Sequence, residues 1–325
     1  MSIRYARMLI GLCVCLAGAR AQAADDVTLR LNTVLNGWHC VWHMARDKGW
    51  FTEQGINLKS IGESRGSADT VQLVAVGTDT FGVADPSVTI ASEVQGLRVK
   101  AVFSLINKSS LAVITPADKP IRVANDLRGK RFAVPASSSV PPLFQAVMKR
   151  NNLTENDVRM VTMDAGVVLT SLVAGQVDGV LLGLDGVPDL DARGFKYTYK
   201  TFADLGVNTP VSSVVTTENT IATNPDLVRR FVSVTQRAWE EAVRNPDAVV
   251  DACSRTKPTI SRETYRKQLD IVLTLLASDA TKGHPIGWGA AADWDSALQV
   301  QKEYRNLKTD QAATTFFTND FLPTE

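Results

Sequence analysis

The stretch Asn36–Phe51, NGWHCVWHMARDKGWF, gathers side chains capable of chemistry near the start of the chain. His39 and His43 stand four residues apart, which places both on one face of a helix. A catalytic zinc needs three protein ligands and a structural zinc needs four, but Cys40 points to another side of such a helix. The ligand count is therefore too small, and we expect no metal site.

A ligand pocket explains this stretch better. Trp38 and His39 follow the expected strand 27–33, and an indole beside an imidazole suits a flat ring, by stacking and one directed hydrogen bond. Trp288, between two glycines, is a second aromatic candidate for the pocket, with a packed loop anchor as the alternative. We expect no cofactor.

A serine hydrolase is the enzyme alternative. The sequence GESRG (62–66) fits G-x-S-x-G, with Ser64 as nucleophile, and Asp185 and His284 follow in the order of a triad. However, this elbow would come after only two strands, and the chain has no HGGG-type oxyanion motif. We therefore expect a protein that is not an enzyme.

Residues 1–23 have the form of a secretory signal. Two arginines precede the apolar run 8–19, and Ala21-Gln22-Ala23 forms an A-x-A cleavage site. Removing these residues, which carry three arginines and no acid, lowers the formal net charge from +1 to −2. This charge argues against nucleic acid as a partner. We expect an exported, periplasmic protein whose remaining cysteines, Cys40 and Cys253, form either a disulfide or two buried thiols.

Short apolar runs alternate with helical segments through the first two thirds of the chain. This alternation predicts α/β architecture, with doubly wound, mostly parallel sheets and flanking helices. Strands are expected at 27–33, 56–61, 80–85, 99–105, 127–135, 157–163, 177–183 and 211–217, and helices at 36–54, 68–76, 141–151, 169–175, 225–243, 246–254, 261–277 and 291–305.

The pattern is repeated within the chain. LVAVGTDTFGVAD (73–85) and LVAGQVDGVLLGLD (172–185) both read as a helix end, a glycine, a strand and an aspartate. The repeat predicts two similar lobes with a ligand cleft between them. We expect residues 24–113 and 217–325 to form one lobe and residues 114–216 the other.

Ligands of open α/β sheets lie beyond the carboxyl ends of the strands. Loops there are rich in glycine, serine and aspartate, and several precede helices, whose first N–H groups suit an anionic or strongly polar group. Helix capping is the alternative role for each serine. The candidates are Gly66, Ser67, Ser137, Ser138 and Ser139.

Three aspartates, Asp85, Asp164 and Asp185, also follow expected strands. Each carboxylate is able to accept hydrogen bonds from a ligand amine or amide, or to cap the next helix. Together, three acids in one cleft favour a ligand that carries donor groups.

An ordered set of motifs resembles a known family. It comprises W-x-x-A-x-x-K-G-W-F-x-x-x-G-I (42–56), VQLVAVGTDTFGVAD (71–85), LRGKRFAVP (127–135), LVAGQVDGV (172–180), NPDLVRRFVSVTQRAW (224–239) and FFTNDFLP (316–323). The set resembles the periplasmic solute-binding family of ABC importers that includes thiamine-pyrimidine, nitrate, sulfonate and taurine binders. The resemblance covers nearly all of the chain after residue 23.

The resemblance implies a two-lobed periplasmic binding protein (type 2). Such a protein closes on a small molecule and passes it to a membrane permease with its ATPase, and a monomer is usual. A periplasmic sensor that serves a receptor would use the same pocket. Pyrimidine binders of the family carry Asn-x-Asn-His, where this chain has Asn36-Gly37-Trp38-His39. The chain lacks the cysteine-rich motif of the related pyrimidine-precursor synthases.

Overall fold

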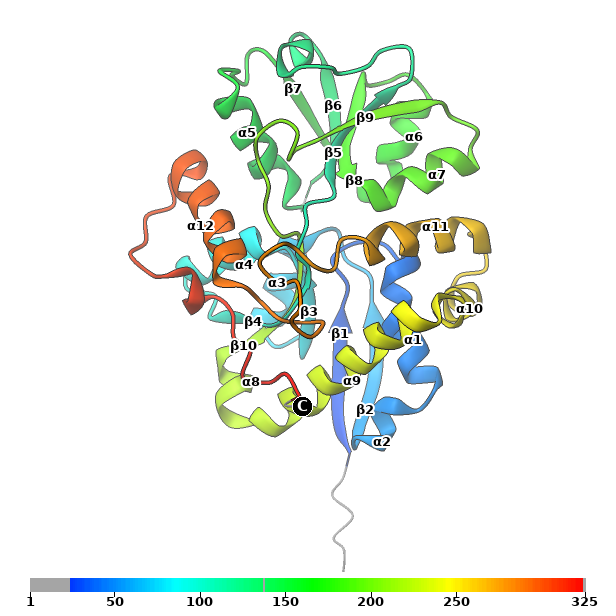
Figure 1. The fold of residues 1–325 in the computed structure, drawn as a ribbon, viewed down its shortest axis with the longest axis vertical. Coiled ribbons are helices and arrows are strands. Elements are labelled where there is room, and N and C mark those ends of the chain that lie inside the picture. The colour runs from blue at the N-terminus through cyan, green and yellow to red at the C-terminus, as the bar shows by residue number, and fades with distance from the viewer. Residues whose placement is uncertain (1–23, 137, 324–325) are drawn as a thin grey trace, which may run out of the picture.

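The computed structural model describes residues 24–136 and 138–323. The expected signal at 1–23 and its cleavage site lie outside these residues, as does Ser137. Figure 1 shows two α/β lobes, one above the other. Within the described ranges, no helix is both long and apolar enough to cross a membrane.

The first lobe contains a five-stranded sheet with the order β2-β1-β3-β10-β4. β1 pairs in parallel with β2 and β3, whereas β10 is antiparallel to both β3 and β4. The strands are β1 (Asp25–Arg30), β2 (Ile56–Gly62), β3 (Phe81–Ala84), β4 (Val99–Ile106) and β10 (Ser212–Thr217).

The second lobe repeats this layout with the order β7-β6-β8-β5-β9. Here β6 is parallel to β7 and β8, and β5 is antiparallel to β8 and β9. The strands are β5 (Leu111–Pro116), β6 (Arg131–Pro135), β7 (Arg159–Met163), β8 (Gly179–Gly183) and β9 (Tyr197–Thr201). The expected class, two mostly parallel sheets with flanking helices, is confirmed.

The chain passes between the sheets twice, between β4 and β5 and again between β9 and β10. The expected boundaries at 113/114 and 216/217 fall inside β5 and β10, a few residues beyond the actual changes of sheet. Each crossing leads directly into one strand, β5 or β10, that runs antiparallel to both of its neighbours in the new sheet. The division into folding lobes by residue number stays a prediction.

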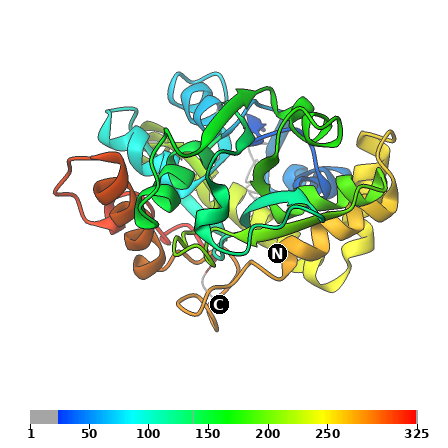
Figure 2. The same cartoon turned by 90° about the horizontal axis from the view of Figure 1, so that it is seen from above.

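Helices cover both sheets. In the first lobe they are α1 (Cys40–Asp47), α2 (Trp50–Glu53), α3 (Ser67–Ala75), α4 (Pro86–Val94), α8 (Glu218–Thr223), α9 (Pro225–Arg244) and α10 (Pro246–Thr256). In the second they are α5 (Val140–Arg150), α6 (Val168–Val173) and α7 (Val187–Ala192). α11 (Arg262–Leu273) and α12 (Ala291–Arg305) follow, and Figures 1 and 2 show them on opposite sides of the molecule.

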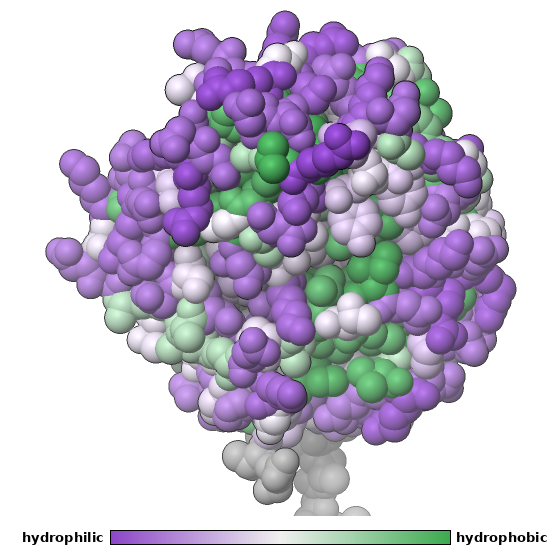
Figure 3. All heavy atoms as spheres, turned by 45° about the horizontal axis from the view of Figure 1, so that its top comes forward, coloured by the Kyte–Doolittle hydropathy of each residue, from purple (hydrophilic) through white to green (hydrophobic). Residues whose placement is uncertain are grey.

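Apolar side chains of the helices and strands form the buried core. α9 buries one face, including Phe231 and Trp239, while its charged residues stay outside. Phe231 stacks on Phe81 of β3 with ring centroids 3.9 Å apart. Figure 3 shows a face that is largely hydrophilic, with a smaller apolar area near its centre.

The repeated motif occupies equivalent places in the two lobes. α3 and α6 each end at a glycine, Gly77 or Gly175, whose φ is +77° or +68°. A side chain is disfavoured in this left-handed conformation, so glycine ends each helix and turns the chain into β3 or β8. Asp85 and Asp185 follow these two strands and face the same gap from opposite sheets.

The helix expected over 36–54 is three shorter elements. A 3₁₀ turn, η1 (Gly37–His39), leads into α1, and Gly49, with φ +77°, separates α1 from α2. Cys40 at the start of α1 is joined to Cys253 of α10 by a disulfide, one of the two outcomes left open by the sequence.

Candidate functional site

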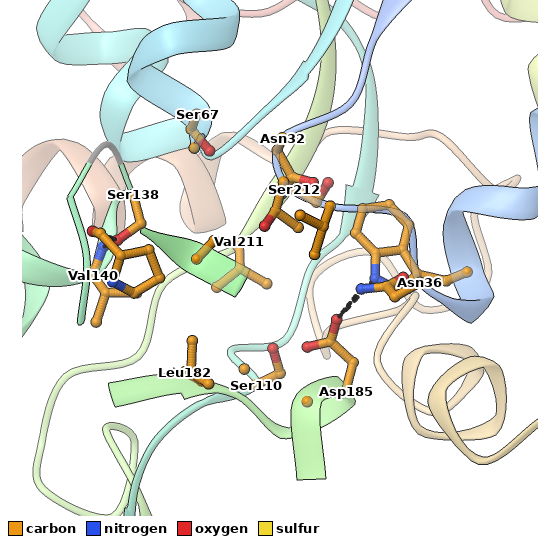
Figure 4. Close-up of a pocket in the computed structure, with 18 of the residues that line it drawn as sticks. Asn32, Asn36, Ser67, Ser110, Ser138, Val140, Leu182, Asp185, Val211 and Ser212 are labelled. Atoms are coloured by element: carbon orange, nitrogen blue, oxygen red, sulfur yellow. Dashed lines mark hydrogen bonds between the residues drawn. The ribbon is translucent and has the colours of Figure 1, made fainter. Parts of the chain in front are cut away.

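A cavity of about 230 Å³ lies between the two sheets. Its walls come from the loops after β1, β2, β3, β6 and β8, and from both crossing segments. Figure 4 shows Asn32, Ser67 and Ser212 of the first lobe on one side and Ser110, Leu182 and Asp185 on the other. The carboxyl ends of the parallel strands thus meet at the cavity, as expected for an open α/β sheet.

Asp185 joins the lobes across this cavity. Its Oδ2 accepts hydrogen bonds from Asn36 Nδ2 at 2.8 Å and from Trp38 Nε1 at 2.9 Å (Figure 4 draws the first). Burial raises the pKa of Asp185, while the donors from Trp38 and Asn36 partly offset this effect. Because the acceptor and its two donors belong to different lobes, these bonds exist only while the lobes are together.

The Trp38 side chain both lines the cavity and belongs to the core. It is 3% exposed, and its ring lies about 6.3 Å from Trp239 and 6.4 Å from Trp42. This aromatic cluster fixes the plane of the indole, which is what a stacking wall for a flat ligand needs.

His39 lies behind the cavity wall rather than on it, and it is fully buried. The backbone N–H of Asn36 donates to its Nδ1 at 3.2 Å, so Nε2 carries the proton and donates to Asn32 Oδ1 at 2.9 Å. Burial, reinforced by His43, lowers the pKa of His39 to about 3. This neutral imidazole therefore holds Asn32 and Asn36, which do line the cavity.

Asp85 lies opposite Asp185, at the start of α4. Its Oδ1 accepts from Ser87 N at 2.7 Å, and its own N–H donates to Ser67 Oγ at 3.1 Å. Burial raises the pKa of Asp85 to about 7, although the Ser139 hydroxyl of the second lobe and the Ser87 N–H favour the ionised form. Asp85 is 1% exposed and lines the cavity.

The C-terminal helix α11 supplies a further link. Gln268 accepts from Gly37 N at 2.7 Å and donates to Asp189 Oδ1, in α7 of the second lobe, at 3.0 Å. One side chain thus connects the Trp38 turn to the opposite lobe at the cavity wall.

The structure brings most of the predicted ligand residues together. Those that line the cavity are Trp38, Gly66, Ser67, Asp85, Ser138, Ser139 and Asp185. Asp164 is exposed and does not line it, and Trp288 stacks on His284, with centroids 4.6 Å apart, as a loop anchor. His39 is one layer behind the wall.

The sequence analysis did not identify several residues that line the cavity. Asn32 and Asn36 lie in the same loop as Trp38, and Ser110 and Ser212 lie where the chain crosses between sheets. Ser110 and Ser212 lie close to the expected lobe boundaries at 113/114 and 216/217, so their closeness to the expected cleft was a usable signal. Gln268 lies within α11 and has no local signal, because only tertiary packing turns it toward the cavity.

The hydrolase arrangement is not assembled. Ser64 is nearly buried and its hydroxyl bonds Gly66 and Thr70 rather than a histidine. His284 is exposed and stacked on Trp288. Among the described residues, no group of three or more potential metal ligands occurs.

Two similar α/β lobes around an interlobe cavity are the architecture of periplasmic solute-binding proteins. The likeness extends to solved structures. The alkanesulfonate-binding protein SsuA from Xanthomonas axonopodis, bound to MOPS, superposes with a TM-score of 0.72 at 13% identity, covering 92% of this chain and 99% of that one. SsuA from Escherichia coli gives 0.69 at 13% identity, covering 91% and 92%.

The family follows from the sequence. The NMT1/THI5 like family model matches residues 36–249, more than half of the chain, and the chain belongs to this family. The riboflavin-binding protein RibY of Chloroflexus aurantiacus is 25% identical over 92% of this chain and 86% of that protein. A 4-amino-5-hydroxymethyl-2-methylpyrimidine phosphate synthase of Legionella pneumophila is 22% identical over 94% and 95%. The resemblance to solute-binding proteins is confirmed.

Proposed function

We propose that the chain is the substrate-binding component of an ABC-type importer in the periplasm. It captures a small organic solute between its lobes and delivers it, as a monomer, to a membrane permease with its ATPase. The observation that carries this proposal is the bridge from Asp185 to Asn36 and Trp38, because it makes the cavity wall dependent on lobe closure.

Binding works through a shift between open and closed lobes. The two crossing segments are the natural hinges, since the described part of the chain passes between the sheets at these two places alone. A ligand that touches both lobes favours the closed form through contacts that the open form lacks. The permease then responds to the closed, loaded form.

The cavity suits a flat heteroaromatic or a small polar organic ligand. The Trp38 indole and the side chains of Leu182 and Val211 give apolar surface, and the serines and aspartates give directed polar contacts. Similar proteins are named for riboflavin, a substituted pyrimidine and alkanesulfonates, which include both flat heteroaromatic and small polar organic molecules.

Binding without chemical change is the expected activity, although some relatives are named as synthases. The two cysteines in the described residues are joined to each other, and His39 and His43 lie outside the cavity wall. A ligand recovered unchanged by mass spectrometry after long incubation would agree with this; a new product would contradict it.

A ligand panel tests the proposal. The chain from Ala24 onward is melted with riboflavin, 4-amino-5-hydroxymethyl-2-methylpyrimidine, MOPS, nitrate and zinc. A ligand at a hundredfold its Kd stabilises the folded state by about 2.7 kcal/mol, which shifts the Tm clearly. We expect a selective rise with one organic class. No rise across a wider set of periplasmic metabolites would overturn the proposal.

A further inference from the structure

The segment between α11 and α12 is bonded to the hinge. In Figure 1 it is drawn in orange and leads from α11 on one side of the first lobe to α12 on the other. Ser104 N, near the end of β4, donates to the Gly287 carbonyl oxygen at 2.8 Å. The N–H groups of Asn107 and Lys108 both donate to the Leu275 carbonyl oxygen, each at 3.1 Å. The first crossing segment is therefore bonded to a distant part of the chain.

Three segments meet at this hinge. The two crossings lie side by side, since Val211 N donates to the Ile106 carbonyl oxygen at 2.9 Å. The C-terminal segment is pressed against the same strand end at Gly287, whose φ is +103°. A Cβ at this position would lie 2.1 Å from the Phe103 ring, so the approach requires glycine.

The side chain of Asn107 ties these segments together. Asn107 is 4% exposed, and both ends of its amide are bonded. Its Oδ1 accepts from Ser104 Oγ at 2.8 Å, and its Nδ2 donates to the Leu276 carbonyl oxygen at 2.9 Å. Asn107 does not line the ligand cavity, so its influence on the cavity has to pass through a neighbouring element.

The helix α11 is that element. It ends two residues before Leu275, and its Gln268, which is 1% exposed, bridges Gly37 N and Asp189 Oδ1 at the cavity. A helix transmits displacement along its length because it is stiff. A shift of the C-terminal end of α11 therefore moves Gln268 relative to its two partners.

The first half of α11 is anchored to other residues of the C-terminal region. Tyr265 Oη donates to the Lys257 carbonyl oxygen at 2.8 Å, and Arg266 Nη1 donates to Asp247 Oδ1 at 3.0 Å. A helix that is held near one end can still swing about that end. The bonds from Asn107 hold the opposite end and so limit this movement.

We propose that Asn107 is a positioning residue of the binding site. By fastening the end of α11 to the first crossing segment, it holds Gln268 where the amide connects the Trp38 turn to Asp189 of the second lobe. The hinge and a contact between the closed lobes are thereby coupled through one side chain. This inference rests on the proposed function, in which closure of the lobes captures the ligand.

Asn107→Asp tests this role with the least change of shape. One oxygen still accepts from Ser104, whereas the other replaces the amide nitrogen that donates to Leu276. Two acceptors then face each other, and we expect the end of α11 to move away from the crossing segment. Asn107→Ala removes the same bond without adding charge and should act in the same direction.

Asn151→Asp is the matched control. Asn151 Nδ2 donates to the carbonyl oxygens of Val147 and Leu205, at 2.8 and 2.9 Å, and both acceptors belong to the second lobe. The control therefore adds the same charge and breaks the same kind of bond away from the hinge. Circular dichroism checks that all variants are folded.

Hydrogen exchange of the Gly37 amide measures the position of Gln268, because this N–H donates to Gln268 Oε1 at 2.7 Å. The rate is read by NMR in the ligand-free protein, with the amides of β1 as a measure of the stability of the first lobe. Relative to those amides, we expect Asn107→Asp to raise the Gly37 rate about tenfold or more. Asn151→Asp should leave this ratio unchanged.

A double variant tests whether Asn107 acts through Gln268. In the Gln268→Ala background, Asn107→Asp should cause no further rise at Gly37, because the bond it controls is already absent. A further rise of the same size would overturn the inference. So would a Gly37 rate that only follows the β1 amides, or an equal rise in Asn151→Asp. Since the measurement needs no ligand, each of these results leaves the proposed solute binder intact.

Discussion

His39 supports the ligand wall from behind. It accepts from the backbone of Asn36 and donates to Asn32, so its neutral form orients two asparagines of the cavity. A second proton on Nδ1 would point at the Asn36 N–H, which also donates. The geometry and the burial thus act in the same direction, and the pKa of His39 falls to about 3.

This lowered pKa makes the stability depend on pH with a definite sign. Between the unfolded pKa of about 6.5 and the folded pKa of about 3, the unfolded state binds one more proton at His39. The stabilising contribution of His39 is therefore present above pH 6.5 and is lost as the pH falls. Its slope approaches about 1.4 kcal/mol per pH unit for one proton.

The His39→Gln variant isolates this contribution. Burial also lowers the pKa of His43, to about 4, and raises that of Asp85 to about 7, so wild type alone mixes opposite trends. We expect the difference in free energy of unfolding between wild type and variant to shrink as the pH falls from 6.5 to 4.5. Urea titrations at four pH values measure it. A difference independent of pH would show that His39 titrates alike in both states.

At the scale of elements, the turn that carries Trp38 is held by two helices. The disulfide ties Cys40 to α10, and Cys253 Sγ lies 3.6 Å from the carbonyl oxygen of Gly37. α11 holds the other side: a Cβ on Gly37 would lie 2.2 Å from the Tyr265 carbonyl oxygen. Only glycine allows this approach, so η1 and α11 are in backbone contact at the cavity wall.

Removing the disulfide should therefore affect both stability and binding. The bond links residues 213 positions apart, and a native disulfide typically contributes about 2–5 kcal/mol. We expect the Cys40→Ala/Cys253→Ala double variant to lose stability of this order and to bind its ligand more weakly, because η1 loses one anchor. Denaturant unfolding and calorimetry measure the two effects.

Refolding of the wild-type protein under reducing conditions is the control, since it leaves the same bond unformed without changing residue volume. It should reproduce the loss of affinity. Affinity unchanged by both treatments would mean that α11 and the aromatic cluster hold the turn by themselves.

Elements with strong periodicity were predictable from the sequence, and those that depend on tertiary pairing were not. α9 and α12 begin and end within a residue of expectation, because Pro225 and the apolar spacing mark them locally. β9 was missed, since Tyr197–Thr201 is a partly exposed edge strand without an apolar run. β5 and α4 were missed too, although an apolar run and the start Asp85-Pro86 mark them in the sequence. The site residues show a similar contrast. Asp85 and Asp185, which follow strands, were identified as site residues from the sequence, whereas Gln268 was not.

At the scale of the whole molecule, three sets of contacts hold the lobes together. The first is the Asp185 bridge, and the second is the pair Gln268–Asp189 from α11 to α7. The third lies on the other side, where Lys149 of α5 donates to the Glu303 carbonyl oxygen of α12 at 2.9 Å. The structure is thus a closed arrangement whose central contact lies in the ligand cavity itself.

Asp185→Ala should shift the balance toward the open form. In the closed form the variant leaves the Asn36 amide and the Trp38 N–H without their acceptor, whereas in the open form water satisfies both. Hydrogen bonds to a charged group contribute about 1.5–3 kcal/mol, so the apparent Kd should rise roughly ten- to a hundredfold. The Tm of the ligand-free protein should change little, because the lost bonds lie between lobes rather than within one core.

Calorimetry gives the Kd, and small-angle X-ray scattering gives the radius of gyration with and without ligand. We expect wild type to contract on ligand addition, and the variant to contract only at higher ligand concentration. Asp118→Ala, in an exposed turn of the second lobe, should behave like wild type. If Asp185→Ala bound as tightly as wild type and contracted equally, closure would depend on the α11 and α12 contacts, and the Asp185 bridge would be its consequence rather than its cause.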